Sequence, residues 1–471
     1  MSSSTPVSSG GAGPPPGSAA EPLPAQPPAA RLSPLDIALI VAGVVIGAGI
    51  FRAPADVARL TGTAPGFLSL WLLGALVALM GGLTYVALAG RAGGIGGEYR
   101  FLELGWGRPV GALFVWARAA VIQTGALATV AFLAGDYLAA VLPGDALLWA
   151  LVSVALVTLF NLLGLSVSAA AQRWLSLAVI AALLLLVAIA LTGNAPTDSA
   201  PAPARGPANP GLALVFVMLV FGGWNEAAYL SGEVRGGAAG LRRGLVGGIL
   251  LVACLYLAVN LAYLASLGID RLAATPAPAL AIAEAALGDP GGAMITLVVV
   301  LAAFSTLNVT TITGARAMCA LGQDLPALAH LGRWDEGRSV PVTALLVQGG
   351  VALALVGLGG LARDGFEAMV AFTAPVFWMF LALVALVPFR RAELGSVRLP
   401  ALGFAAACLW MLWSSIGYAR LLASQSEVAG WLGFGGLALV AAGLPLALRA
   451  RPVRSTGSGR ALRGTAATPR R

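Results

Sequence analysis

The chain has 471 residues, of which 59% are hydrophobic and only 10% are charged, and its mean hydropathy is +0.89. These values lie outside the range of soluble globular domains and predict an integral membrane protein. Every basic residue is arginine, and the absence of lysine excludes a Walker-type phosphate-binding loop. The net charge of +8 does not indicate nucleic-acid binding, because the arginines are dispersed among polar segments without interleaved aromatic residues.

The chain begins with a polar tail and continues with long apolar segments. Residues 1–32 consist mainly of Ser, Gly, Ala and Pro, which predicts disorder and no cleavable signal peptide. The predicted fold class is an all-α integral membrane protein with 12 transmembrane helices, because twelve later segments are long and apolar enough to span a bilayer. Their approximate ranges are 35–60, 66–90, 109–141, 146–164, 172–193, 211–234, 243–268, 291–321, 341–361, 366–389, 399–423 and 428–449.

The distribution of arginine predicts the orientation of these helices. An even number of spans puts both termini on one side of the membrane. Loops on that side contain 13 arginines even without the C-terminal tail, whereas the opposite loops contain five. Because cytoplasmic loops carry an excess of basic residues, both termini are predicted to lie in the cytoplasm and the protein in the cytoplasmic (cell) membrane.

Two of the predicted spans are interrupted by glycine. The first contains the sequence IGAGIF at residues 46–51, and the sixth contains FGGWNE at residues 221–226. An opened backbone inside a membrane has N–H and C=O groups that lipid cannot satisfy, so such a break is expected where it lines a cavity or meets a ligand. Small residues at GxxxG spacing, such as Gly43 and Gly47, also serve as simple packing contacts between helices, and for one break alone this interpretation is the stronger.

Two breaks that lie five spans apart are typical of an inverted-repeat transporter, with substrate held between them. The predicted core is therefore a 5+5 inverted repeat with broken helices 1 and 6, plus two additional helices. The predicted segments are a disordered N-terminal tail at 1–32, a first repeat at 33–193, an extracellular linker at 194–210, a second repeat at 211–389, helices 11 and 12 at 390–449, and a basic cytoplasmic tail at 450–471.

The residues of both breaks resemble motifs of a known family. Residues 46–51 are similar to the G-[SA]-G-I-F signature of the amino acid, polyamine and organocation (APC) superfamily, and residues 221–225 resemble its L-type amino acid transporters and their bacterial relatives. Further matches follow in the family's order: Gly96-Gly97-Glu98-Tyr99 with Gly105, Asn161 with Gly164 and Gln172, and residues 305–326 with Asn308, Arg316, Gly322 and Leu325-Pro326. The resemblance covers about residues 33–449 and implies an amino acid permease, a secondary active transporter that works by alternating access.

The substrate implied by this resemblance is an α-amino acid, whose carboxylate and ammonium both need partners once they leave water. Backbone N–H groups at the positive end of a half-helix suit a carboxylate, so we assign it to Gly47, Ala48 and Gly49. Unpaired carbonyl groups at the C-terminal ends of the opposite half-helices suit an ammonium. For that role the resemblance implies the carbonyls of Val45, Ile46, Leu219, Val220 and Gly222.

Selectivity for the substrate side chain is expected to come from residues around the breaks. Leu219 stands where eukaryotic relatives carry a gating aromatic residue, so either Phe221 gates the site or closure is looser. Asn225 is predicted to line the pocket as a hydrogen-bonding group. Because no acidic cluster faces the predicted cavity, a neutral amino acid is favoured, and cationic amino acids, polyamines and other organic amines are the alternative substrates.

Glu226 is a charged residue that the interpretation as a carrier of neutral amino acids does not explain. A carboxylate within a span marks a substrate or proton path in many membrane proteins. It is either a counter-ion for a cationic substrate, a proton carrier, or a structural partner of an in-span arginine such as Arg52 or Arg118.

The coupling ion is left open between sodium and a proton. In proton-linked or ion-independent relatives a lysine often stands near the position of Val179, and this chain has none. Ser305 and Thr306 supply adjacent hydroxyl groups, so one hypothesis is a sodium site formed with carbonyls near Gly43 and Ile46. The other is that both hydroxyls bond back to their own helix.

Three other classes of protein, a membrane-embedded enzyme, a channel and a regulatory membrane subunit, are disfavoured. A membrane-embedded enzyme would need a cluster of reactive side chains, whereas the single His330 lies in a polar loop and the three cysteines lie far apart in apolar runs. A channel is disfavoured because no filter sequence is repeated. Some L-type relatives need a single-span partner joined through a cysteine between spans three and four; residues 142–145 contain none, so a stand-alone carrier without a cofactor is predicted.

Overall fold

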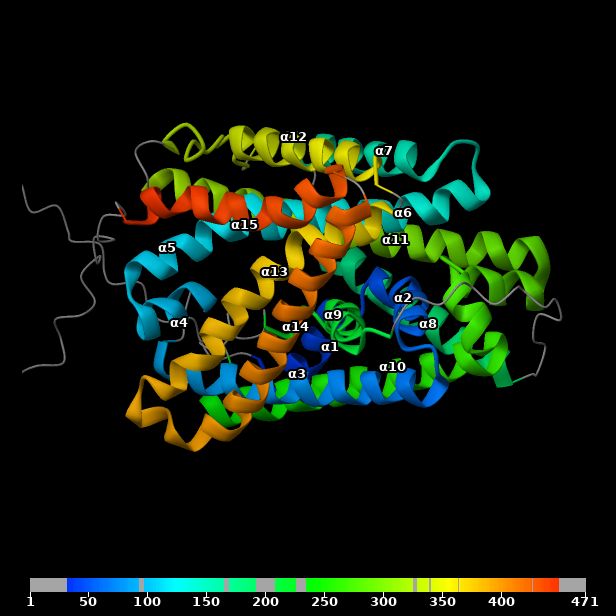
Figure 1. Cartoon of the computed structure of the whole chain (residues 1–471), viewed down its shortest axis with the longest axis horizontal. Coiled ribbons are helices and arrows are strands. Elements are labelled where there is room, and N and C mark those ends of the chain that lie inside the picture. The colour runs from blue at the N-terminus through cyan, green and yellow to red at the C-terminus, as the bar shows by residue number, and fades with distance from the viewer. Residues whose placement is uncertain are drawn as a thin grey trace, which may run out of the picture. The chain divides into compact units, whose positions relative to one another are not determined.

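The computed structural model describes residues 32–92, 97–164, 169–191, 208–225, 234–324, 328–338, 340–362, 364–425 and 427–448. In these segments every regular element is a helix (Figure 1). Two isolated β-bridges also occur, between Leu32 and Val234 and between Asp335 and Val340. The predicted all-helical class is confirmed. Glu226 lies outside the described residues, as do 1–31, 192–207 and 449–471, which hold most of the predicted tails and linker.

The helices follow the predicted ranges, and the first range is divided into three pieces. The first half of the chain contains α1 (Pro34–Val45), η1 (Ala48–Phe51), α2 (Ala53–Thr61), α3 (Ala64–Ala92), α4 (Gly97–Trp106), α5 (Arg108–Ala117), the π-helical turn η2 (Arg118–Ile122), α6 (Gln123–Val141), α7 (Ala146–Leu162) and α8 (Ala169–Leu191). The second half contains α9 (Pro210–Val220), α10 (Gly237–Ala274), α11 (Pro278–Asp324), α12 (Val342–Gly359), α13 (Gly365–Leu386), η5 (Val387–Phe389), η6 (Ala392–Val397), α14 (Arg398–Gln425) and α15 (Glu427–Leu448).

Among the described residues, eight helices are long and apolar enough to cross a membrane, and this confirms a multi-pass membrane protein. Four shorter helices are also apolar, namely Pro34–Val45, Ala146–Leu162, Leu177–Leu191 and Pro210–Val220. The first and last of these are α1 and α9, which end at the two glycine-rich breaks. The count of twelve spans and the inverted repeat remain predictions.

Polar side chains at the helix starts explain where several of these helices begin. Ser33 and Asp36 form a reciprocal capping box at α1, in which Ser33 Oγ accepts from the Asp36 N–H at 3.2 Å and Asp36 Oδ2 accepts from the Ser33 N–H at 2.8 Å. Asp145, Asn209 and Asp364 cap α7, α9 and α13 in the same way, each accepting from a backbone N–H of the first turn.

The packing of α1 on α10 depends on two glycines one helical turn apart. A Cβ atom at Gly244 would stand 2.6 Å from Ile37 Cβ, and one at Gly248 would stand 2.7 Å from Val41 Cβ. Neither distance leaves room for a side chain, so only glycine lets these helices approach so closely. This contact brings the end of α1 against the middle of α10.

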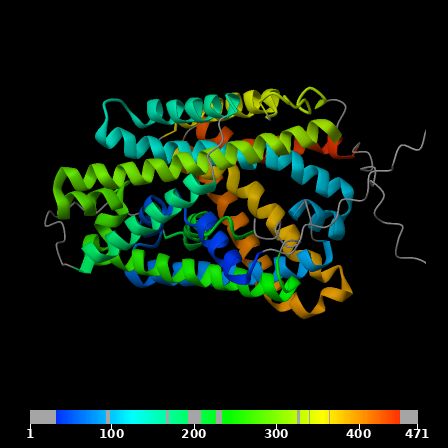
Figure 2. The same ribbon diagram turned by 180° about the vertical axis from the view of Figure 1, so that it is seen from behind.

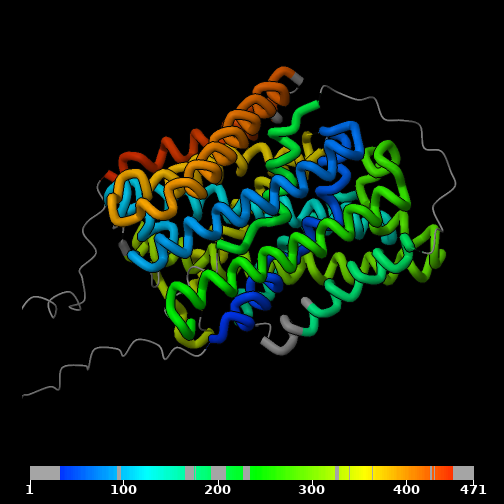
Figure 3. Tube along the Cα trace, turned by 90° about the horizontal axis from the view of Figure 1, so that it is seen from below, coloured from blue at the N-terminus to red at the C-terminus, as the bar shows by residue number. Residues whose placement is uncertain are grey.

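The remaining helices surround this pair and α9. The helix α9 contacts α2, α3 and α14 (Figure 1). From behind, α7 and α12 run together along one edge and α10 along the opposite edge (Figure 2). The last two helices, α14 and α15, lie side by side (orange and red in Figure 3). The two breaks therefore lie inside the bundle.

Candidate functional site

The first break begins where α1 ends, at Val45. Ile46 leaves the helix with φ −74° and ψ 90°, and Gly47 is fully extended with φ −119° and ψ −169°. The chain then forms the short 3₁₀ turn η1 and continues as α2. Because the backbone is not helical at these residues, the regular i to i−4 hydrogen bonds are interrupted. The last carbonyl groups of α1 are therefore left without helical partners.

The second break begins where α9 ends, at Val220. Gly223 has φ +103°, a conformation that side chains strongly disfavour, and a Cβ atom there would stand 2.9 Å from Val44 Cγ1 and 3.2 Å from the Val44 carbonyl oxygen. On the other side of the contact, a Cβ atom at Gly49 would stand 3.3 Å from Val220 Cγ2. The structure therefore brings the two breaks into direct contact, and glycine is required at 223 both for its backbone conformation and for the approach.

Three buried tyrosines donate their hydroxyl groups to carbonyl oxygens of these broken segments. Tyr256 Oη lies 2.9 Å from the Val45 oxygen and 3.3 Å from the Val220 oxygen. Tyr137 donates to the carbonyl of residue 51 at 2.8 Å, and Tyr263 donates to that of residue 50 at 3.4 Å. Buried backbone carbonyls need such partners, so the tyrosines stabilise the interruption of the helix.

Of the predicted ion-coupling residues, Ser305 and Thr306 lie on α11, and Thr306 lies beside the first break. Thr306 Oγ1 would be 3.6 Å from a Cβ atom at Gly47, and it donates a hydrogen bond to the carbonyl of Ala302 on its own helix at 3.0 Å. This is the back-bonded arrangement of the simpler hypothesis. It uses the proton of the hydroxyl group and leaves the oxygen lone pairs of Thr306 next to the break.

The two candidate gating residues lie in different surroundings. The Phe221 ring is buried between Trp71 and Tyr256, with ring centroids 6.2 Å and 5.3 Å apart, respectively. Leu219 is 41% exposed, and its carbonyl already accepts from the N–H of Gly222 at 3.3 Å. The aromatic ring is thus held beside the break by a packed cluster, whereas the leucine side chain is exposed.

Asn225 reaches a carboxylate at one end of the bundle. Its Nδ2 donates to Glu98 Oε1 at 2.6 Å, and the same carboxylate accepts from the Tyr85 hydroxyl at 3.5 Å and lies 3.6 Å from Arg118 Nη1. Glu98 is 2% exposed, so its charge is balanced mainly by these neighbours. The amide of Asn225 that was predicted to line the pocket is engaged here.

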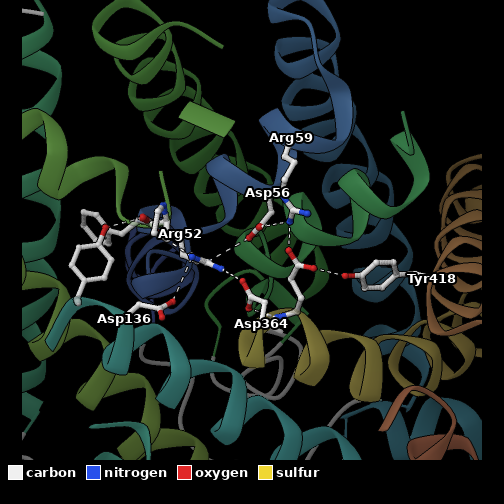
Figure 4. Close-up of polar contacts among 10 residues, drawn as sticks. Arg52, Asp56, Arg59, Asp136, Asp364 and Tyr418 are labelled. Carbon is white, nitrogen blue, oxygen red and sulfur yellow. Dashed lines mark hydrogen bonds and ion pairs between the residues drawn. The ribbon is translucent and has the colours of Figure 1, made fainter. Parts of the chain in front are cut away.

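A second charged cluster surrounds Arg52, which stands between η1 and α2 and is 4% exposed (Figure 4). Its Nη2 lies 2.5 Å from Asp364 Oδ2, its Nη1 lies 3.5 Å from Asp136 Oδ2, and its Nε lies 3.7 Å from Asp56 Oδ2. Nη1 also donates to the carbonyl of Pro276 at 3.3 Å. One guanidinium therefore joins α2, α6, α13 and the segment between α10 and α11.

The cluster continues along α2 to Arg59. This arginine pairs with Asp56 Oδ1 at 2.8 Å and with Glu367 of α13, whose other oxygen accepts from the hydroxyl of Tyr418 on α14 (Figure 4). In total, two guanidinium groups face four carboxylates.

Beside the charged cluster lies a cavity of about 340 Å³, lined by Asp136, Thr275, Pro276 and Glu284 among others. Its lining contains no residue of either break, so it is separate from the predicted substrate site.

Comparison with known proteins decides the family. The family model described as Amino acid permease matches residues 32–446. The chain belongs to the amino acid permease family. The permease is 24% identical to the serine/threonine exchanger SteT of Bacillus subtilis (strain 168) over 361 residues, which cover 75% of this chain and 82% of that protein.

Two further relatives are mammalian. The b(0,+)-type amino acid transporter 1 of Homo sapiens is 24% identical over 372 residues, 75% of this chain and 75% of that protein. The cystine/glutamate transporter of Homo sapiens is 23% identical over 395 residues, 79% of this chain and 77% of that protein. The predicted recognition is confirmed, and the chain is an amino acid transporter of the membrane.

Sequence analysis of the permease missed the tyrosines and the partners of its in-span arginines. One of the three interpretations of Glu226 pairs it with Arg52 or Arg118. Glu226 lies outside the described residues, and the described carboxylate partners of these two arginines are Asp364 and Glu98, among others. The available signal was the presence of isolated tyrosines and acidic residues inside or at the ends of apolar segments. Such residues are costly in lipid and therefore indicate an internal partner.

Proposed function

We propose that the permease is a secondary active transporter that carries neutral amino acids by alternating access, with substrate held between the two breaks. The observation that supports this most directly is the contact of the two interrupted helices, in which Gly223 lies against Val44 and Gly49 against Val220. A binding site in the interior of the helix bundle gives a reason for two openings of the helical backbone to meet there.

The substrate's two charged groups have separate partners in this proposal. Backbone N–H groups of Gly47, Ala48 and Gly49 receive the carboxylate at the start of η1. Carbonyl oxygens at the ends of α1 and α9, including those of Val45 and Val220, receive the ammonium. These are the groups that lost their helical partners where α1 and α9 end.

A neutral substrate is favoured by the charges beside the site. The carboxylates of Asp56, Asp136 and Asp364 next to the first break are all engaged with Arg52, so a cationic side chain would have to compete with a guanidinium. The Bacillus relative is named for serine and threonine, two small neutral amino acids. Cationic amino acids and organic amines remain the alternative substrates.

The wider architecture follows from the same proposal. We place twelve spans in a 5+5 inverted repeat with two additional helices, in the cytoplasmic membrane with both termini in the cytoplasm. In this orientation the cluster around Arg52 lies toward the extracellular side, where it joins α2, α6 and α13 and has to separate when the site opens outward. The carrier acts alone, without a single-span partner.

Coupling to sodium is the version that the surroundings of Thr306 favour. Its hydroxyl oxygen lies beside the first break, and together with Ser305 and backbone carbonyls near Gly43 and Ile46 it would form the oxygen-rich site that a hard cation needs. A proton is the alternative coupling ion, carried by a carboxylate such as Glu226.

The test is counterflow and uptake in proteoliposomes with labelled serine, threonine, alanine, leucine, arginine and putrescine, with and without sodium and a pH gradient. Ala48→Trp places a bulky ring in the predicted carboxylate site and is expected to abolish transport. Gly350→Trp is the matched control, because this position of α12 is exposed and a Cβ atom there meets nothing within 4 Å. Transport by Ala48→Trp at the wild-type rate, or no transport of any amino acid by the folded wild type, would contradict the proposal.

A further inference from the structure

A single hydroxyl group lies between the C-terminal ends of both interrupted helices. Tyr256 is fully buried, and its Oη reaches the carbonyl oxygen of Val45, the last residue of α1, and that of Val220, the last residue of α9, at 2.9 Å and 3.3 Å. A hydroxyl has one proton, so it donates to one carbonyl at a time or shares the proton between them. The proposed function assigns no role to the Tyr256 hydroxyl.

Packing holds this hydroxyl in place. Tyr256 lies on the face of α10 that also carries Gly244 and Gly248, whose lack of side chains brings α1 alongside. Its ring is held edge-on by Trp71 and by Phe221, with centroids 6.1 Å and 5.3 Å away and interplanar angles of 79° and 72°. Because the side chain is fully buried against these rings, its surroundings direct the hydroxyl at the two carbonyls.

The carbonyls that Tyr256 satisfies are among those assigned to the substrate ammonium. The phenol hydroxyl donates an O–H and the ammonium donates N–H groups to the same oxygens. The ammonium has three protons to donate, whereas the hydroxyl has one. Without substrate, the hydroxyl is the donor that a closed, water-free site offers to these carbonyls. With substrate, the ammonium takes over part or all of that role.

We propose that Tyr256 is a positioning residue of the empty carrier: it satisfies the carbonyls of Val45 and Val220 when no substrate is bound, and so permits the empty site to close and reorient. This inference rests on the proposed function. Its consequence is a difference between two modes of transport. Exchange requires only the loaded carrier to reorient, whereas net efflux requires the empty carrier to return as well.

The experiment compares Tyr256→Phe with the wild type in proteoliposomes that contain the labelled amino acid of the panel with the highest counterflow. In Tyr256→Phe the empty carrier must close over carbonyls that have lost their donor, so net efflux is expected to fall by about tenfold or more. Exchange against an excess of the same amino acid is expected to stay within about twofold of wild type, because the ammonium supplies the missing donor.

The matched control is Tyr263→Phe, which removes an equally buried hydroxyl from the same helix. That hydroxyl donates to the carbonyl of Ile50 in η1 and to neither helix end. Its removal is expected to change efflux and exchange by the same factor.

A second measurement does not depend on reconstitution. Saturating substrate is expected to raise the thermal unfolding midpoint of Tyr256→Phe in detergent by more than it raises that of the wild type, because substrate replaces a donor that this variant lacks. An equal or smaller shift contradicts the inference.

The outcomes separate the inference from the function on which it rests. Equal loss of efflux and exchange in Tyr256→Phe, unchanged efflux, or a wild type that exchanges without any net efflux would each overturn the role of Tyr256 while leaving the transporter proposal intact. A folded wild type that performs neither mode with any amino acid would contradict the proposed function itself, and this inference with it.

Discussion

Removal of the buried guanidinium of Arg52 is expected to be the most destabilising single substitution in the charged cluster. Arg52→Met keeps the length of the side chain and removes its charge, which leaves Asp136 and Asp364 without a guanidinium partner and Asp56 with Arg59 alone. Breaking a buried ion pair costs about 3–5 kcal/mol, because the remaining charge has lost its partner. The shortest contact, 2.5 Å to Asp364, crosses 312 positions of sequence, so the loss removes a link between the start of α2 and the start of α13.

The matched control is Arg59→Met, in the same cluster and the same helix. The Arg59 side chain is 36% exposed, against 5% for Arg52, whereas its partners Asp56 and Glu367 are only 4% and 13% exposed. Solvent therefore screens this guanidinium but not the carboxylates, and the expected loss is smaller than for Arg52, about 1–3 kcal/mol. Both variants are compared with wild type by thermal and denaturant unfolding in detergent, followed by tryptophan fluorescence. The difference between the two isolates the effect of burial.

A rescue variant tests whether uncompensated negative charge is the cause. Combining Arg52→Met with Asp136→Asn and Asp364→Asn removes two of the three carboxylates that Arg52 pairs with. This variant is expected to recover a large part of the lost stability. Asparagine at 364 retains the cap of α13, in which Oδ1 accepts from the Glu367 N–H at 3.1 Å. If Arg52→Met unfolds no earlier than Arg59→Met, or if the triple variant is less stable than Arg52→Met alone, the reasoning is refuted.

Three further substitutions test the two breaks and the ion site. Gly223→Ala forces a side chain into φ +103° and toward α1, and it is expected to lower the free energy of unfolding by about 1–3 kcal/mol and to slow counterflow. The control Gly350→Ala, in open surroundings of α12, is expected to match or exceed the wild-type stability. Equal thermal unfolding midpoints for the two variants would contradict backbone strain at residue 223. Ala48→Trp is expected to bind no substrate in a thermal-shift titration while unfolding as a single species, and a normal substrate shift would rule out the carboxylate site. Ser305→Ala combined with Thr306→Ala is expected to abolish any stimulation of uptake by sodium, and unchanged stimulation would exclude these hydroxyls as ligands.

Much of the fold was predictable because it depends on local composition. Apolar segments of about twenty residues have few alternatives to membrane helices, and most helices of the structure overlap the predicted ranges, although α4 lies between two ranges and α10 and α11 extend beyond theirs. The breaks were also predictable, since glycine within an apolar run weakens a helix wherever the run is placed. In both cases the physical cause lies within one short segment.

The partners of the polar side chains were not predictable in this way. Asn225 is predicted to line the pocket, and its hydrogen-bond partner in the structure, Glu98, is 127 positions earlier in the chain. A pairing of Arg52 with Glu226 was one of three interpretations, and the described partners of Arg52 are Asp56 of α2, Asp136 of α6 and Asp364 at the start of α13. A charged group in a membrane protein needs a partner, but its own sequence neighbourhood does not say which segment will supply it.

By itself the sequence determined the membrane class, the positions of the helices and the two points at which the backbone opens, because hydrophobicity and glycine act over a few residues. Only the tertiary structure decided what those openings meet. Tyr256 lies 211 positions from Val45, and its hydroxyl reaches the end of α1 because two glycines of α10 allow the helices to touch. Hydrogen bonds over such separations depend on close packing between helices, and close packing is a property of the assembled bundle.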